Sequence, residues 1–420
     1  MDRQKVLLFG AAAAVRLLLF TAFPSLPHLL AGRVEVSTPV TSFKRLQEGL
    51  FLYTHNVSPY DGGVYHQAPL LLPLFSLLPN PSYYPFATNV LFTVVDLLGA
   101  QALMQIADSG QSVKTRLFES SRKELRWSSL AMAAGFLFNP FTIATCIARS
   151  TSALTNLFIL AAMAKASQGA SITFVFAIAI ASYLSMHPVL LFPPLLLLCY
   201  HVRASKSASA PSLLSFAIGH AGALASTCGG LLYVSALLTG SWEFMRATYG
   251  VRLLLPDLTP NVGLWWYFFT EMFDSFREFF LGVFWLHVAS YMPGLTIRLR
   301  KQPLFVAVTL TGVFAVFTPY PSIADAALYL SLVPLFRHLF PLMRYTFLAS
   351  ATILYASFLG PAFYYLWIYA GSGNANFFYA ITLVWSLGLS VIVGDSLYAA
   401  LRDELDVERP ELKGKEVKRI

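Results

Sequence analysis

Charged residues are scarce in this chain of 420 residues, of which Asp, Glu, Lys and Arg make up 12%. A typical soluble domain carries about 25%. The shortage excludes an ordinary water-exposed surface over most of the molecule, and 56% of the residues are hydrophobic. The composition therefore predicts a polytopic membrane protein. The net charge of +8 is attributed to basic cytoplasmic loops rather than to nucleic-acid binding.

Signatures of metal, cofactor and nucleophile chemistry are also missing. The chain has only three cysteines, Cys146, Cys199 and Cys228, and all fall in apolar stretches, so they are predicted to be small core residues rather than disulfide partners. No Gly-x-Ser-x-Gly elbow or phosphate-binding P-loop occurs, and the histidines lack metal-ligand spacing. No cluster of Lys and Arg residues falls in a segment that could form a soluble nucleic-acid-binding domain. The sequence thus predicts no catalytic residue, metal, cofactor or nucleic-acid partner.

Long apolar segments are abundant instead. A membrane helix needs roughly 20 mostly apolar residues, and by this criterion the chain has about twelve spans. The predicted fold class is an all-α polytopic membrane protein with a single multi-pass domain over residues 1–420. The predicted spans start near Val6, Tyr84, Trp127, Thr151, Ser171, Pro188, Leu213, Asn261, Leu304, Ala324, Tyr345 and Phe377.

The distribution of Lys and Arg predicts the orientation. With the N-terminus in the cytoplasm, the alternate segments hold most of the basic residues, as the positive-inside rule requires. An even number of spans follows, with both termini cytoplasmic and a basic tail over 402–420. The predicted lumenal segments are the long first loop 24–83 and the stretches 240–261, 318–322 and 371–376. Since functional loops gather on one face of a scaffold, we expect the site on the lumenal face.

Glu35 lies near the start of the first lumenal loop, and the other acidic residues of this loop, Glu48 and Asp61, are far along the chain. Ser42 to Leu52 has the spacing of a helix lying in the membrane interface. This loop resembles that of the GT-C class of membrane glycosyltransferases, and Ser58-Pro59-Tyr60 followed by Pro69-Leu70-Leu71 resembles the mannosyltransferases of glycosylphosphatidylinositol (GPI) synthesis. Glu35 has no acidic neighbour, although divalent metals need several oxygen ligands. The interpretation is a GT-C-like scaffold without the transferase chemistry.

Two blocks are the most distinctive parts of the chain. The first runs from Pro256 through Asp257 and Asn261 into the aromatic residues Trp265, Trp266 and Phe269. It is interpreted either as an interfacial aromatic belt or as the wall of a lipid-binding cleft, and Asn261 or Thr259 is predicted to cap a helix from Val262. The second, Leu366 to Tyr379, contains Asn374 and Asn376 on a glycine-flanked turn. These two side chains either cap the next helix or contact a glycolipid head group.

Together these blocks resemble the PIG-U family of GPI transamidase subunits. The supporting matches extend from the first loop to the last helix and comprise Arg33-Val34-Glu35-Val36, Val57-Ser58-Pro59-Tyr60, Asn139-Pro140-Phe141-Thr142-Ile143, Ala148-Arg149-Ser150-Thr151, Glu271-Met272-Phe273, Asp325 with Ala327-Leu328-Tyr329, and Ala380-Ile381-Thr382. The resemblance implies a non-catalytic subunit of an endoplasmic reticulum membrane complex that attaches GPI to proteins. The implied partners are a catalytic cysteine-protease-like subunit, the remaining membrane subunits, membrane lipids and GPI itself.

The residues predicted to bind GPI are Asn374, Asn376, Asp257, Asn261, Trp265, Trp266 and Phe269. An alternative function is an active GT-C mannosyltransferase using dolichol-phosphate mannose, with Glu35 as its base. A secondary transporter is disfavoured, because transporters of that kind are built from internal repeats and the sequence shows none.

Overall fold

The computed structural model describes residues 2–81, 83–206 and 211–415, so residues 416–420 of the predicted tail lie outside the description. Every regular element in these ranges is helical, and the only β-type pairing is an isolated bridge between Lys114 and Glu119. The elements are α1 (Asp2–Ala22), α2 (Leu26–Ala31), α3 (Phe43–Thr54), α4 (Leu71–Ser76), α5 (Pro85–Asp108), α6 (Ser129–Leu137), α7 (Pro140–Ile147), α8 (Ser152–Gln168), α9 (Ser171–Leu184), η1 (His187–Leu191), α10 (Phe192–Lys206), α11 (Leu213–Thr239), η2 (Met245–Gly250), α12 (Val251–Leu254), α13 (Trp265–Glu271), α14 (Asp274–Arg298), α15 (Pro303–Phe317), α16 (Ile323–Leu332), η3 (Val333–Leu342), α17 (Thr346–Ile368), α18 (Ala375–Glu408) and η4 (Pro410–Leu412).

Eight helices in the described part of the chain are long and apolar enough to cross a membrane, and a bent pair raises this number to nine. The eight are α1, α5, η1 with α10, α11, α14, α16 with η3, α17 and α18. The sequence predicted about twelve spans from a length of roughly 20 residues each. Several predicted spans are shorter in the structure, since α8, α9 and α15 have 17, 14 and 15 residues. The all-helical, multi-pass architecture is therefore established, and the number twelve is not.

Two predicted spans are broken. The span expected from Trp127 consists of α6 and α7, which meet at an angle of 53°, because Asn139 precedes Pro140 and takes the extended backbone that proline imposes on the residue before it. The span expected from Asn261 begins later: α13 starts at Trp265, and extended backbone at Met272 and Phe273 separates α13 from α14.

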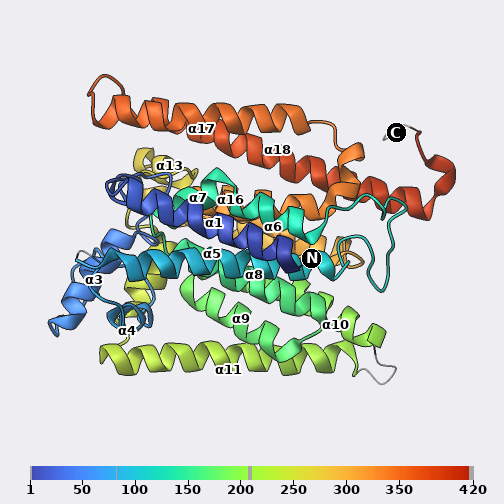
Figure 1. Ribbon diagram of the computed structural model, residues 1–420, viewed down its shortest axis with the longest axis horizontal. Helices are drawn as coiled ribbons and strands as arrows, with labels where there is room; N and C mark the ends of the chain where they lie inside the picture. The colour runs from blue at the N-terminus through green and yellow to red at the C-terminus, as the bar shows by residue number, and fades with distance from the viewer. Residues whose placement is uncertain (1, 82, 207–210, 416–420) are drawn as a thin grey trace.

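The bundle is elongated, with most helices running along its long axis (Figure 1). The α17–α18 pair forms one edge and α11 the opposite edge, with α1, α5 and α8 between them. Helix α15 lies in the core, since every residue from Pro303 to Val316 is buried. By contrast, α11 and α14 bury only 11% of their most apolar stretch inside the bundle. Exposed apolar helix surface of this kind is stable in contact with lipid tails or with other membrane helices.

Three of the four segments predicted to be lumenal contact one another at one end of the bundle, and the fourth, the turn between α17 and α18, lies at the same end (Figure 1). The backbone N–H of Ile323 donates to Glu35 O over 2.9 Å, the guanidinium of Arg45 donates to Asp257 over 2.9 Å, and the Tyr320 hydroxyl donates to Asp257 O over 2.7 Å. Helices α3, α4 and α13 lie at this end (Figure 1), which is called the loop end below. The long first loop and the later short loops thus form one folded cap.

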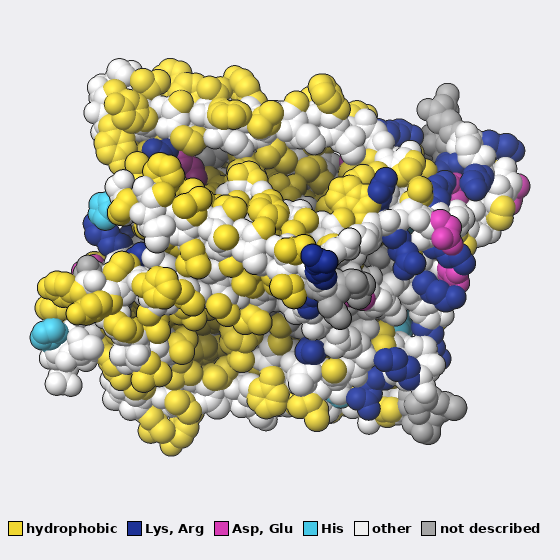
Figure 2. All heavy atoms as spheres, in the orientation of Figure 1, with side chains coloured by type: hydrophobic (Ala, Val, Ile, Leu, Met, Phe, Trp, Pro, Cys, Tyr) yellow, Lys and Arg dark blue, Asp and Glu magenta, His cyan; other side chains and the backbone are white. Residues whose placement is uncertain are grey.

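Lys and Arg side chains gather at the opposite end, where α18 ends (Figure 2). There Arg122 binds the buried carboxylates of Asp403 and Asp406 over 2.7 and 2.6 Å. Helix α18 continues to Glu408, so the first residues of the predicted basic tail over 402–420 are helical. The ion pairs with Arg122 connect this part of α18 to the loop over 109–128.

Candidate functional site

The two sequence blocks contact each other at the loop end. Tyr267 of α13 donates a hydrogen bond to the Asn376 side chain at the start of α18. The rings of Tyr267 and Tyr379 stack with centroids 4.6 Å apart, and Trp266 stacks on Trp367 with centroids 6.2 Å apart. Residues more than 100 positions apart therefore build one aromatic junction between α13, α17 and α18.

The aromatic residues of α13 belong to the interior of this junction. Trp265 and Phe269 pack on Phe284 of α14, and the indole N–H of Trp265 donates to Phe317 O over 2.9 Å. Trp265, Trp266 and Phe269 are all buried. These three side chains hold α13 against its neighbours, and they do not line the cleft described below.

Asp257 and Asn261 organise the loop before α13. Asn261 is fully buried, its side-chain oxygen accepts from Gly263 N over 2.8 Å, and its amide donates to Thr259 O over 3.2 Å. The expected helix cap at Asn261 or Thr259 is therefore wrong, because the helix starts four residues after Asn261 and Asn261 closes a loop turn instead. A Cβ at Gly263 would lie 2.5 Å from Pro321, which explains a glycine at this position.

The Asp257 carboxylate faces an open polar cavity at the loop end, which is also lined by His66, Arg246 and Glu243. Burial acts to raise the pKa of Asp257, but hydrogen bonds from Thr259 and the charge of Arg45 outweigh it, so this pKa lies below its ordinary value. Burial lowers the pKa of His66, whose ring bonds Ala247 O over 2.8 Å. Asp257 is thus an anionic anchor for Arg45.

Asn374 and Asn376 are both exposed on the turn between α17 and α18. The side chain of Asn374 accepts from Phe377 N over 3.3 Å, so it caps α18. Asn376 accepts from Tyr267. Both residues thus lie beside the aromatic junction, whereas Asp257 lines the cavity that also contains His66.

A mostly apolar cleft of about 390 Å³ lies beneath α17 and α18. Figure 2 shows the corresponding hollow between these two helices and the rest of the bundle. Its walls come from α2, α7, α17, α18, the first residue of α16 and neighbouring loop residues. The lining residues are Leu29, Leu30, Arg33, Glu35, Val36, Phe141, Ala144, Val262, Ile323, Ala356, Ser357, Gly360, Pro361, Phe378, Ile381, Thr382 and Trp385.

An ion pair is the charged feature of this cleft. Arg33 donates to both carboxylate oxygens of Glu35, over 3.1 Å from Nε and 2.8 Å from Nη2. The same guanidinium donates to Pro361 O over 3.3 Å and lies 5.4 Å from the Tyr364 ring centroid. Both charges are mostly buried, with side-chain exposures of 18% and 10%. The pair ties the first loop to α17, so Glu35 is engaged in structure.

Sequence reasoning identified Glu35 and the blocks that supply Val262 and Phe378 to the cleft, but it missed the lining from α17 and the middle of α18. One signal was available. Gly360 and Pro361 lie side by side inside helix α17, and a Cβ at Gly360 would meet only Ile381, at 4.0 Å. A glycine leaves free space beside its helix. Only the packing of α18 against α17 shows that this space is part of a cleft.

Comparison with known proteins defines the family. A family model described as GPI transamidase subunit PIG-U matches residues 10–385. The human GPI-anchor transamidase component PIGU is 36% identical over 414 residues, covering 95% of this chain and 94% of the relative. The GPI transamidase component GAB1 of Saccharomyces cerevisiae is 34% identical over 418 residues, covering 98% of both. A match of this extent, together with the sequence blocks that meet at the loop end, shows that the chain belongs to the PIG-U family.

Proposed function

We propose that this chain is a non-catalytic subunit of a GPI transamidase complex, which holds the acyl chains of GPI in the cleft beneath α17 and α18 and supports assembly. The cleft is the observation that carries the proposal. Its size lies within the range of small-molecule sites, which are concave and mostly apolar with few polar groups. Membership of a family of GPI transamidase subunits supports GPI as the ligand.

The shape of the cleft suits an amphiphile. Apolar side chains such as Leu29, Ala144 and Ile381 line its length, while Arg33 and Glu35 supply a charged group. An acyl chain gains free energy from contact with such a lining, at about 25 cal/mol per Å² of apolar surface removed from water. The head group would lie toward the loop end, where Asn374 and Asn376 are exposed. These two asparagines are proposed as contacts of the glycan or phosphate oxygens, while Asp257, Asn261, Trp265, Trp266 and Phe269 support that end of the fold.

The non-catalytic role is supported by the state of Glu35. A general base needs a carboxylate that reaches a substrate proton, whereas both oxygens of Glu35 accept from Arg33. In the described residues, no group of three or more His, Cys, Asp or Glu side chains is arranged to hold a metal ion. The bonding of Glu35 favours a GT-C-like scaffold without transferase activity over an active mannosyltransferase. The proposed scaffold has about twelve membrane segments, several of them shorter than the usual 20 residues.

The proposed location is the endoplasmic reticulum membrane, with the basic end in the cytoplasm and the loop end in the lumen. The proposed partners are the catalytic cysteine-protease-like subunit and the remaining membrane subunits, for which the exposed apolar faces of α11 and α14 offer surface. Labelling of single cysteines placed at Lys415 and Ser372 in sealed microsomes tests the orientation. Protection of residue 415 together with access to residue 372 would reverse it.

Filling the cleft tests lipid binding. Gly360→Leu adds four carbon atoms to a position where a Cβ meets only one atom, at 4.0 Å. The change favours the helix by about 1 kcal/mol, so the complex should assemble normally while bound GPI, measured by mass spectrometry of the purified complex, falls at least tenfold. Gly394→Leu is the matched control, because Gly394 lies on the same helix pair with open space around it and outside the cleft. Equal GPI content in both variants and the parent chain would refute the proposal.

A further inference from the structure

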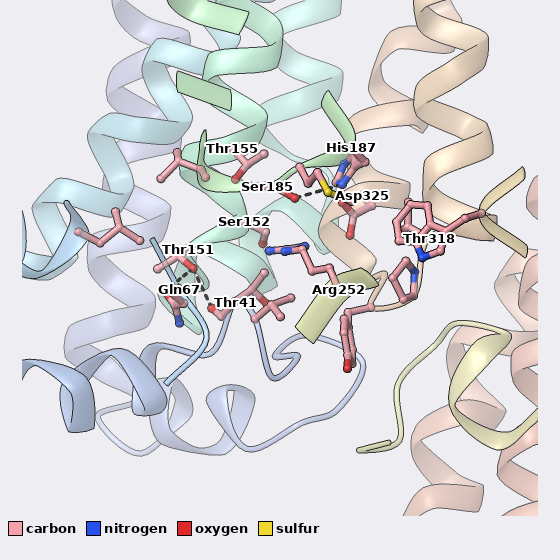
Figure 3. A pocket seen from close by; sticks show the side chains of 17 residues that line it. Thr41, Gln67, Thr151, Ser152, Thr155, Ser185, His187, Arg252, Thr318 and Asp325 are labelled. Atoms are coloured by element: carbon pink, nitrogen blue, oxygen red, sulfur yellow. Dashed lines mark hydrogen bonds between the residues drawn. The ribbon is translucent and has the colours of Figure 1, made fainter. Parts of the chain in front are cut away.

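A second pocket lies deeper in the bundle, on the other side of the first loop from the apolar cleft. Val36 of this loop lines the cleft, whereas Val40 and Thr41 line the second pocket. Helix α16 likewise gives Ile323 to the cleft and Asp325 to the pocket. Figure 3 shows polar side chains from separate elements converging here, among them Ser152, Thr155, His187 and Arg252. The term polar pocket is used for this site.

Arg252 is the feature that the fold does not account for. Its residue exposure is 8%, and its Nε has no hydrogen-bond partner in the described chain. No ion pair among residues 2–81, 83–206 and 211–415 includes Arg252. Burial lowers the pKa of Arg252 to about 10 although Asp325 acts to raise it, so the side chain is cationic at neutral pH. A buried cation without a partner is costly, and native structures keep such charges paired.

Asp325 does not fill this role, because its carboxylate is committed elsewhere. One of its oxygens, Oδ2, accepts from Ser322 N over 2.8 Å and from Ser322 Oγ over 3.0 Å, which completes the capping box of α16. Its charge acts on Arg252 from a distance greater than the 4.0 Å of an ion pair. The guanidinium donors of Arg252 therefore remain available to a molecule in the pocket.

The opposite wall favours an anion. Ser152 and Thr155 lie at the start of α8 and line the pocket, where the Ser152 hydroxyl also shares a hydrogen bond of 2.8 Å with the Ser150 hydroxyl. The backbone N–H groups of Ala153 and Leu154 already donate to Ser150 O and Thr151 O, so the backbone contribution of this end is the partial positive charge that the dipole of a 17-residue helix places there. A helix start with hydroxyl groups, set opposite an arginine, supplies the donors that phosphate oxygens require.

From this geometry we infer that the polar pocket binds a phosphate group, held by Arg252 from one side and by Ser152, Thr155 and the start of α8 from the other. The group is a phosphate ester of a lipid head group or a free phosphate, which present the same oxygens. The inference stands apart from acyl-chain binding in the cleft, since it concerns a different cavity and other side chains.

The test uses the full chain within its complex, purified in dodecyl maltoside without phosphate. Inorganic phosphate should raise the melting temperature of the parent complex and of Arg246→Met, an exposed arginine in another cavity. Arg252→Met should remove this response. It should also melt no lower than the parent without phosphate, because replacing an uncompensated buried charge by an apolar side chain is neutral or stabilising. Thr155→Val, which keeps the branched shape, should weaken the phosphate response about 2- to 10-fold.

Two arms distinguish the sources of the phosphate. Phosphatidylinositol added in mixed micelles should shift the phosphate titration to higher concentration if a lipid head group occupies the site, and leave it unchanged if free phosphate does. Three results would overturn the inference: no phosphate response in the parent complex, an equal response in Arg252→Met, or unfolding of Arg252→Met in phosphate-free buffer while Thr155→Val responds like the parent. The GPI content of the cleft variant Gly360→Leu tests only the apolar cleft, because Gly360 does not line the polar pocket.

Discussion

The ion pair between Arg33 and Glu35 predicts how the first loop is anchored, and Glu35→Gln tests it. The substitution keeps the size of the side chain and removes its charge. At 2.8 Å and an effective dielectric constant of 20, the Coulomb attraction is about 6 kcal/mol before desolvation. Desolvation cancels most of this, and charged hydrogen bonds contribute about 1.5–3 kcal/mol net. Because the two side chains are 18% and 10% exposed, we expect Glu35→Gln to cost about 1–2 kcal/mol.

A double-mutant cycle isolates the pair. Arg33→Gln, Glu35→Gln and the double variant are unfolded in mixed micelles of sodium dodecyl sulfate and dodecyl maltoside, with tryptophan fluorescence as the readout. The cost of the double variant should be smaller than the sum of the single costs by about 1 kcal/mol or more. GPI attachment to a reporter should fall only in proportion to complex abundance. Normal stability and assembly of Glu35→Gln with a drop of 10²–10⁴ in attachment, the contribution of a general base, would refute the anchor and make Glu35 catalytic.

Three further predictions concern the loop end. Asn374→Ala should destabilise the chain by about 1 kcal/mol through the lost cap of α18, whereas Asn376→Ala should leave co-purification with the complex unchanged; reduced GPI attachment at normal assembly in either variant supports head-group contact, and a loss of attachment in proportion to assembly argues against it. In the folded chain the pKa of His66 lies below its ordinary value, so its neutral form stabilises the fold above about pH 6.5, and this contribution is lost as the pH falls below that value. His66→Gln should therefore reduce the change of the unfolding midpoint between about pH 6.5 and 5, and an unchanged pH dependence would contradict this. Gly263→Ala places a Cβ 2.5 Å from Pro321 and should destabilise the chain by about 1–3 kcal/mol, while Gly229→Ala, with open space around it in α11, should not; equal unfolding midpoints would show that the loop yields.

Local chemistry accounts for what the sequence predicted well. Long apolar stretches with few charges require helices in a membrane protein, since lipid offers no partner for backbone groups. Ser42 precedes a helix that the structure begins at Phe43, and the Asn374 side chain caps α18, because capping depends on neighbours within a few residues. The two blocks were also recognisable by themselves, as dense aromatic runs beside polar turns.

The sequence by itself determined the membrane class, the helical fold and the family, because these follow from composition and from motifs read along the chain. Only the tertiary structure decided which residues form cavities. Trp265 and Phe269 carry the pattern of a cleft wall, but α14 covers them, while Gly360 becomes a cleft residue because α18 leaves space beside it. Arg252 is unremarkable in the sequence and acquires its role only when α8 and α16 bury it. Burial and pairing depend on contacts with other helices, which no pattern within one helix encodes.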